Sequence, residues 1–118
     1  MILGTDTEVR KVTGISEIEE RDICKFLQGL VYSWCKNNKG WFAMRDLMGG
    51  DNFFWEGTPL YVLYEKHKSQ GKREQAVQDA GKDAGWLLKK VLFEDKRNFE
   101  TKKDGLVRQY KWDEDSSY

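Results

Sequence analysis

The chain has 118 residues, of which 39% are hydrophobic and 14% aromatic, enough to bury one core and unlike a disordered chain. Its 20 basic and 20 acidic residues give a net charge of zero, which counts against strong generic binding to nucleic acid. No apolar run approaches the roughly 18 residues of a transmembrane helix, and no secretory signal is visible at the start. We therefore expect a cytoplasmic protein with no membrane partner.

The charge is unevenly distributed along the chain. Residues 64–112 contain 13 Lys and Arg against 8 Asp and Glu, a net of +5, whereas residues 1–63 carry −2 and residues 113–118 carry −3. We expect a single domain, with its core over residues 15–112 and an acidic tail after it. Residues 1–14 would form an N-terminal arm or a short strand, and two alternatives stay open for them: an arm that wraps a second copy, and a frayed terminus.

A capping box predicts the first helix. Ser16 stands at the cap position and Glu19 three residues later, before an apolar stripe with helical spacing from Ile23 to Trp34. Gly40 follows the predicted end of this helix.

Short elements are expected in the middle of the chain. Trp41 and Phe42 form an apolar pair that favours a β-bridge to the C-terminal hairpin, and residues 43–48 allow one or two helical turns. Thr58 and Pro59 predict the start of another helix, with threonine as the cap and proline at the first helical position.

Three consecutive aromatic residues, Phe53, Phe54 and Trp55, allow two interpretations. They form either an exposed platform, of the kind that stacks unpaired bases, or a plug that covers Trp86 and Phe93. We favour the plug, because large aromatic side chains usually enter cores or interfaces.

The chain is organised around a long helix and the β-hairpin that follows it, over residues 76–112. Apolar or small residues recur with helical spacing from Val77 to Val91. Gly81 and Gly85 interrupt this helix, and each weakens a helix by about 1 kcal/mol relative to alanine. They suggest either close backbone packing or a helix that is held by tertiary contacts. The opposite face carries Gln75, Gln78, Asp79, Lys82, Trp86, Lys89 and Phe93.

Asp104 and Gly105 predict the turn of the hairpin, since this dipeptide suits a two-residue turn. Counting outward from the turn places Phe99, Tyr110 and Trp112 on one face, which we expect to pack on the preceding helix. The predicted pairs are Lys103–Leu106, Thr101–Arg108, Phe99–Tyr110 and Arg97–Trp112.

No constellation for catalysis or metal binding is visible in the sequence. Cys24 and Cys35 would lie about 16 Å apart along one helix, too far for a disulfide, and His67 is the single histidine. Residues 49–51, Gly-Gly-Asp, lack the continuation of a phosphate-binding loop. We expect a non-enzymatic protein with no metal, cofactor or small-molecule substrate, although paired carboxylates stay open.

The order of the elements resembles the winged helix-turn-helix superfamily. The resemblance lies in topology rather than in a specific motif, and it rests on residues 23–34, 41–42, 58–67, 77–91 and 99–110. It implies an α+β, mainly helical winged-helix-like fold with three to four helices and a C-terminal β-hairpin.

The resemblance also implies a small DNA-binding or regulatory protein, because members of this superfamily mostly bind DNA. The exposed side of the long helix would face the major groove of double-stranded DNA, and the basic hairpin tip would hold phosphates. The candidate nucleic-acid-binding residues are Gln75, Gln78, Lys82, Lys89, Lys102, Lys103 and Arg108.

The alternative is a protein-interaction module, either a subunit or inhibitor of a larger complex or a homodimer. It is motivated by the zero net charge and by aromatic residues on the outward helix face. A continuous basic strip through Lys82, Lys89, Lys102 and Arg108 would favour nucleic acid, whereas a broken strip beside an apolar patch would favour protein. The candidate partner-binding residues are Trp86, Phe93, Phe53, Phe54 and Trp55.

Overall fold

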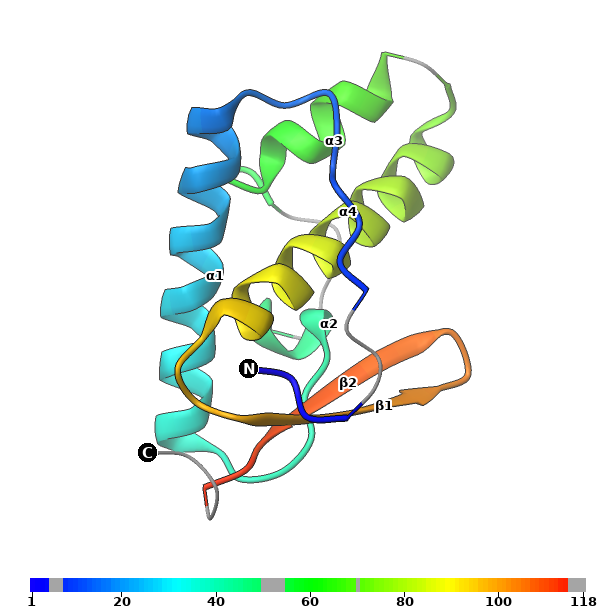
Figure 1. Cartoon of the computed structure of the whole chain (residues 1–118). Coiled ribbons are helices and arrows are strands. Elements are labelled where there is room, and N and C mark those ends of the chain that lie inside the picture. Colours follow the sequence, from blue (N-terminus) through cyan, green and yellow to red (C-terminus); the bar gives the residue numbers. More distant parts are fainter. Residues whose placement is uncertain (5–7, 50–54, 70, 115–118) are drawn as a thin grey trace.

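The computed structural model describes residues 1–4, 8–49, 55–69 and 71–114. Within these residues it contains four helices and one antiparallel hairpin: α1 (Glu17–Asn37), α2 (Met44–Leu47), α3 (Tyr61–Lys68), α4 (Arg73–Glu94), β1 (Phe99–Asp104) and β2 (Val107–Trp112) (Figure 1). The expected mainly helical α+β architecture with a C-terminal hairpin is therefore confirmed. None of the described helices combines the length and the apolar character needed to cross a lipid bilayer.

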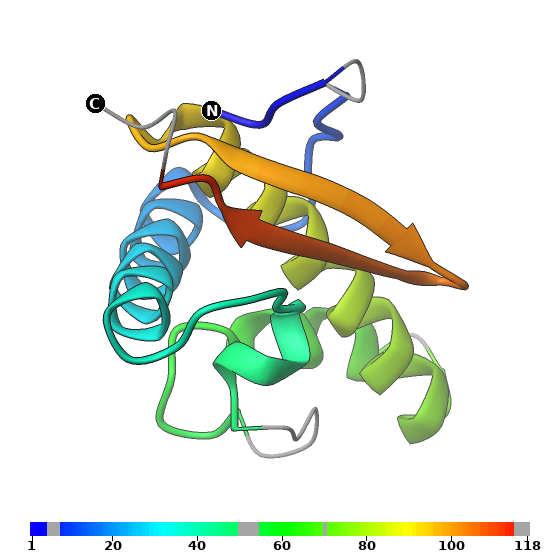
Figure 2. The same cartoon turned by 90° about the horizontal axis from the view of Figure 1, so that it is seen from below.

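The helices pack around α4, and the hairpin closes one end of the molecule. Both α1 and α3 contact α4. Figure 1 shows α1 along one side, with α4 crossing beside it and the hairpin across the lower end. Seen from below, the base of the hairpin lies beside α1, and its tip extends away from α1 and over α4 (Figure 2).

The capping box of α1 is present as predicted. The backbone N–H of Glu19 donates to Ser16 Oγ at 3.1 Å, and the backbone N–H of Ser16 donates to the Glu19 carboxylate at 2.8 Å. Ile23, Leu27 and Val31 are buried at a spacing of four residues, which confirms the predicted apolar stripe. Both cysteines lie on α1 as free thiols.

The predicted bridge between Phe42 and the hairpin is confirmed, and it lies at the centre of the core. Phe42 and Tyr110 exchange two backbone hydrogen bonds of 2.8 Å. The Phe42 ring lies 6.1 Å from that of Tyr110 and 6.3 Å from that of Phe99, in the range where aromatic pairs add about 0.5–1.5 kcal/mol beyond burial. Phe99 and Tyr110 are buried and Trp112 is partly buried against the same core, so the hairpin face is placed as expected.

The register of the hairpin differs from the prediction by two residues. Phe99 pairs with Trp112 rather than with Tyr110, and Gly105 and Leu106 form the turn. Gly105, with φ of +61°, therefore stands first in the turn and not second. Since side chains alternate with a period of two, this shift leaves the three aromatic rings on the face that was predicted. The pattern of apolar residues could not distinguish the two registers.

The described part of the N-terminal arm packs on its own chain. Ile2 forms a parallel bridge with Phe99, whose backbone N–H donates to the carbonyl of Met1 at 2.7 Å. Val12 is buried in the core, and residues 8–13 belong to no helix or strand. The start of the arm is thus joined to the base of the hairpin by a single β-bridge.

The helix expected at Thr58 and Pro59 begins two residues later than predicted, since α3 starts at Tyr61. Thr58 caps the turn before α3: its hydroxyl accepts from the backbone N–H of Leu60 at 3.2 Å and donates to the carbonyl of Trp55 at 2.8 Å. Thr58 therefore caps the turn that leads into the helix and not the helix itself.

A buried ion pair fixes the link between α4 and β1. The Arg97 guanidinium contacts the Asp95 carboxylate at 2.9 and 3.1 Å, and Gln28 donates to the same carboxylate at 2.7 Å. The two charged side chains are 8% and 5% exposed. Burial alone would raise the pKa of Asp95, but the hydrogen bonds from Arg97 and Gln28 outweigh it and lower this pKa to about 2. We call Asp95, Arg97, Phe99 and the Phe42–Tyr110 bridge the hairpin base.

Candidate functional site

A groove of about 880 Å³ lies between the outward face of α4 and the tip half of the hairpin. Its lining comes from α4 between Val77 and Lys89 and from the hairpin between Lys103 and Tyr110. The N-terminal arm adds Glu8 and Arg10, and the segment that begins α2 adds residues 43–45. We call it the α4–hairpin groove. It brings together elements that are far apart in the sequence.

The floor of the groove is apolar and includes bare helix backbone. Gly81 and Gly85 lie one turn apart on α4, and a Cβ atom added to either would meet no other atom within 4 Å. Val77, Leu88 and Tyr110 line the groove beside them. The close backbone packing suggested by the two glycines is therefore not made by the described part of this chain, and the space above them is open.

The lining of the groove is strongly basic. Among the lining residues, six carry a positive charge and Glu8 alone carries a negative one, in a chain whose net charge is zero. Glu8 and Arg10 form an ion pair of 3.1 Å with both side chains well exposed, so solvent screens much of their attraction. The positive lining residues are Arg10, Arg45, Lys82, Lys89, Lys103 and Arg108.

Trp86 lies in the groove between two cations. The Arg10 guanidinium stands 5.0 Å from the centre of the indole ring and the Lys89 ammonium 5.3 Å from it. Contacts of this kind contribute about 0.5–1 kcal/mol at exposed sites and more when they are desolvated. Trp86 is half-buried, and its outward position on α4 agrees with the prediction.

Apolar side chains project from the hairpin tip beside the basic lining. Leu106, in the turn, is 95% exposed, and Val107 next to it is also exposed. Both line the groove. A single exposed leucine is ordinary, but here two apolar residues stand opposite an apolar helix face across an open space.

Five of the seven candidate nucleic-acid-binding residues line this groove, and four of them are exposed or half-buried. Gln78 and Lys82 line it from α4, and Lys103 and Arg108 from the hairpin. Gln75 is exposed on the first turns of α4, outside the groove lining, and donates to the Asp79 carboxylate at 3.0 Å.

The remaining two candidates break the predicted basic strip. Lys89 is only 5% exposed, with its ammonium 5.3 Å from the ring centre of Trp86, so its assignment to an exposed nucleic-acid-binding surface was wrong. Lys102 pairs with Gln109 on the opposite hairpin face from the Lys103–Arg108 pair, and its ammonium lies 4.3 Å from the ring centre of Trp41. Lys102 therefore does not continue the surface of Arg108.

The candidate partner-binding aromatics also separate. Trp55 is 4% exposed and belongs to the core, so its assignment to a partner-binding surface was wrong. Phe93 is 41% exposed, so the expected plug does not cover it within the described residues. Phe53 and Phe54 lie outside the described residues. Phe93 is exposed on the last turns of α4, away from the groove lining, which leaves Trp86 as the one partner candidate found in the groove lining.

Sequence reasoning missed Arg10, Arg45, Leu106 and Val107. No local pattern marked the two arginines, which reach the groove only because the arm and the start of α2 fold against α4 and the hairpin. The predicted register placed Leu106 inside the strand, whereas it lies in the actual turn and is 95% exposed. Val107 begins β2 and is also exposed. One sequence signal for the groove was the pair Gly81 and Gly85, because two glycines destabilise a helix unless their missing side chains serve another purpose.

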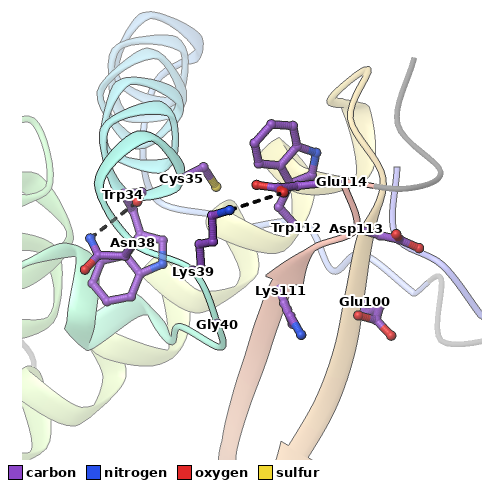
Figure 3. Close-up of a pocket in the computed structure, with 10 residues that line it drawn as sticks. All are labelled: Trp34, Cys35, Asn38, Lys39, Gly40, Glu100, Lys111, Trp112, Asp113 and Glu114. Atoms are coloured by element: carbon purple, nitrogen blue, oxygen red, sulfur yellow. Dashed lines mark hydrogen bonds and ion pairs between the residues drawn. The ribbon is translucent and has the colours of Figure 1, made fainter.

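A second, smaller pocket of about 430 Å³ lies where the end of α1 meets the hairpin base (Figure 3). Its charges are mixed: Lys39 and Lys111 face Glu100, Asp113 and Glu114, and Lys39 lies 3.9 Å from Glu114. Burial raises the pKa of the Cys35 thiol in its wall, so the thiol stays protonated at neutral pH, and the protonated thiol is the unreactive form.

A polar cluster ties α3 to α4. The Asp83 carboxylate accepts from Lys66 and contacts His67 Nε2, both at 2.7 Å, and Lys66 also donates to the carbonyl of Thr13. His67 is half-buried and does have a carboxylate neighbour, which the sequence alone could not place. Within the described residues no group of three or more His, Cys, Asp and Glu side chains is arranged to hold a metal ion.

Comparison with known proteins adds nothing to this picture: no family model, no characterised protein and no solved structure matches the chain. The resemblance to the winged helix-turn-helix superfamily therefore stays a prediction from element order. The functional argument rests on the groove itself.

Proposed function

We propose that this chain is a protein-interaction module that binds its partner in the α4–hairpin groove. The observation that carries the proposal is a groove of about 880 Å³ whose lining combines apolar residues with six cations and one carboxylate. Apolar surface gains about 25 cal/mol for each Å² removed from water, provided that the partner brings apolar atoms to cover it. A protein segment brings such atoms together with charges.

The interruption of the basic strip supports a protein partner over duplex DNA. Lys89 is enclosed and Lys102 faces the other side of the hairpin, so the two halves of the strip do not join. Phosphate contacts supply most of the affinity for duplex DNA and need exposed cations along the backbone. The apolar floor beside Gly81 would stay uncovered by a phosphate backbone.

A displayed library of random peptides tests the proposal, with the whole chain as bait. We expect the wild-type chain to enrich peptides whose binding is weakened by Gly81→Leu, since a leucine there fills the floor. The Cβ of this leucine meets no atom within 4 Å, so the fold should tolerate it. Enrichment of no peptide, or only of peptides that bind the Gly81→Leu variant equally well, would contradict the proposal.

Double-stranded DNA is the second candidate, and a specific observation favours it. Gln78 and Lys82 on α4 stand across the groove from Lys103 and Arg108, with all four reaching its lining. Anisotropy of a labelled duplex of about 20 base pairs across a salt series tests this candidate. For each tenfold rise in salt concentration, the logarithm of the affinity falls by about 0.9 per neutralised phosphate. Tight binding at physiological salt with a steep slope would favour DNA, and a flat or absent response would remove it.

A further inference from the structure

We infer that the occupant of the α4–hairpin groove is an acidic amphipathic helix supplied by a partner protein. This inference rests on the proposed function and goes further, since it names the charge, the conformation and the approximate length of the bound segment.

The charge of the occupant follows from the positions of the cations. Lys82 stands on the α4 side and Arg108 on the hairpin side, while Arg45 and Arg10 reach the groove from α2 and from the arm. The lining is therefore positive on each of the elements that border the groove. An occupant with carboxylates along both flanks would meet these cations, and a basic occupant would meet repulsion from several directions.

The conformation of the occupant follows from the floor. Packed helices usually lie about 8–10 Å apart, at a distance set by the side chains between them. Gly81 and Gly85 remove those side chains from two successive turns, and the space above them is open. A second helix lying along α4 would use this space, since small residues on one helix let another approach closely.

The hairpin offers little to an extended occupant at its base. β1 already pairs there with Ile2 and β2 with Phe42, so the edges near the base are taken. At the tip, Leu106 in the turn is instead 95% exposed and lines the groove, so it offers an apolar side-chain contact to an occupant. Side-chain contacts of this kind suit an amphipathic helix in a groove better than the addition of a strand.

The length of the floor sets the length of the occupant. The lining residues of α4 run from Val77 to Lys89, which spans about 18 Å at 1.5 Å per residue. A bound helix of about three turns would cover it, with apolar residues on the face toward Gly81 and Gly85 and carboxylates on either side.

The direct test uses a fluorescein-labelled probe peptide of about 14 residues, with leucine at positions i, i+3, i+4 and i+7 and glutamate on both flanks. Two matched probes accompany it: one with lysine in place of every glutamate, and one with proline at its centre to break the helix. We expect the acidic helical probe to bind the full chain at least about tenfold more tightly than either matched probe, as measured by anisotropy.

Substitutions in the chain test whether the probe binds at the glycine floor of the groove. Gly81→Leu and Gly85→Leu should each weaken binding of the acidic probe by about tenfold or more. Gly29→Leu is the matched control, because Gly29 also lies in a helix and has open space for a side chain. Gly29 is exposed on α1, outside the groove, so this variant should leave the affinity unchanged. Circular dichroism of each variant shows whether the helices are retained.

The outcomes separate this inference from the proposed function. Equal binding of the acidic and lysine probes would overturn the acidic assignment, and equal binding of the proline probe would overturn the helical one. No binding of any probe would overturn the occupant named here. In these cases the displayed-library experiment still decides whether the groove binds protein segments. Unchanged affinity in both glycine variants would contradict the inference and the proposed function together.

Discussion

The base and the tip of one hairpin are built in opposite ways. At the base, Phe99 and Tyr110 are buried, backbone bridges occupy both edges, and the Asp95–Arg97 pair is enclosed. At the tip, Leu106 is almost fully exposed and Lys103 is exposed beside it. The contrast shows that the hairpin is anchored to the core at its base, while its tip is left exposed across the groove from α4.

This division of labour explains how an open groove persists in a small chain. Apolar groups on α4 and on the tip would gain free energy by closing against each other, at about 25 cal/mol per Å². The base holds β1 and β2 in position through the core around Phe42, so the tip projects over α4 with the groove between them. Stability and binding are therefore expected to separate when the two ends are changed one at a time.

The largest effect is expected from Phe99→Ala at the base. Phe99 is fully buried and pairs with the ring of Phe42, and truncation of a buried phenylalanine typically costs about 3–5 kcal/mol. Urea unfolding monitored by circular dichroism measures the change in the free energy of unfolding. A loss well below about 1 kcal/mol would show that the base does not anchor the hairpin.

The next effect is a loss of stability in acid through Asp95. Because the pKa of Asp95 is lowered to about 2 in the folded chain from an ordinary value of 3.8, its contribution is complete above that ordinary value. It is lost as the pH falls through the folded pKa. The difference amounts to about 2 kcal/mol at 1.36 kcal/mol per pKa unit.

Urea unfolding of the wild-type chain and of Asp95→Asn at several pH values between about 5 and 2 measures this contribution. The variant should be less stable at neutral pH, because Arg97 loses its charged partner, and its stability should fall less steeply in acid. Parallel pH profiles of the two proteins would contradict the assignment.

A smaller effect is expected from Gly105→Ala in the turn. Gly105 has φ of +61°, a left-handed conformation that costs an L-residue with a side chain about 1–2 kcal/mol. Gly81→Ala provides the comparison, since its helical position with open space should instead gain about 0.4–1 kcal/mol. Thermal unfolding of both variants measures the two shifts, and a stabilising Gly105→Ala would argue against the observed turn.

The smallest effect on stability is expected from Leu106→Ala at the tip. The side chain is 95% exposed, so its loss should change the free energy of unfolding by no more than about 0.5 kcal/mol. The same variant should weaken binding of the acidic probe, because Leu106 borders the groove. A large loss of stability would mean that the tip is part of the core, and unchanged binding would remove it from the site.

Much of the fold could be read from the sequence because its signals are local. The capping box at Ser16 needs only two residues three positions apart, and the apolar stripe of α1 needs only a helical period. The bridge at Phe42 was also foreseen. The register was not, because a shift of two residues keeps every side chain on its face, and the choice between turns depends on packing at Phe99.

The site was half predictable for the same reason. Lys82 and Arg108 were identified on separate elements, but only the folded chain shows that they border one groove. Helical spacing placed Lys89 outward, but only 5% of it is exposed in the folded chain. Arg10 and Arg45 could not be predicted as groove residues, because the sequence around them does not indicate which helix or strand they pack against.

The most direct test of the central claim is a titration of the ¹⁵N-labelled chain with the acidic helical probe, followed by two-dimensional NMR. The account predicts that the amide shifts will concentrate on α4 from Val77 to Lys89 and on the tip from Lys103 to Arg108, with the hairpin base unmoved. Shifts centred on the pocket between α1 and the base, or no shifts at saturating probe, would contradict it.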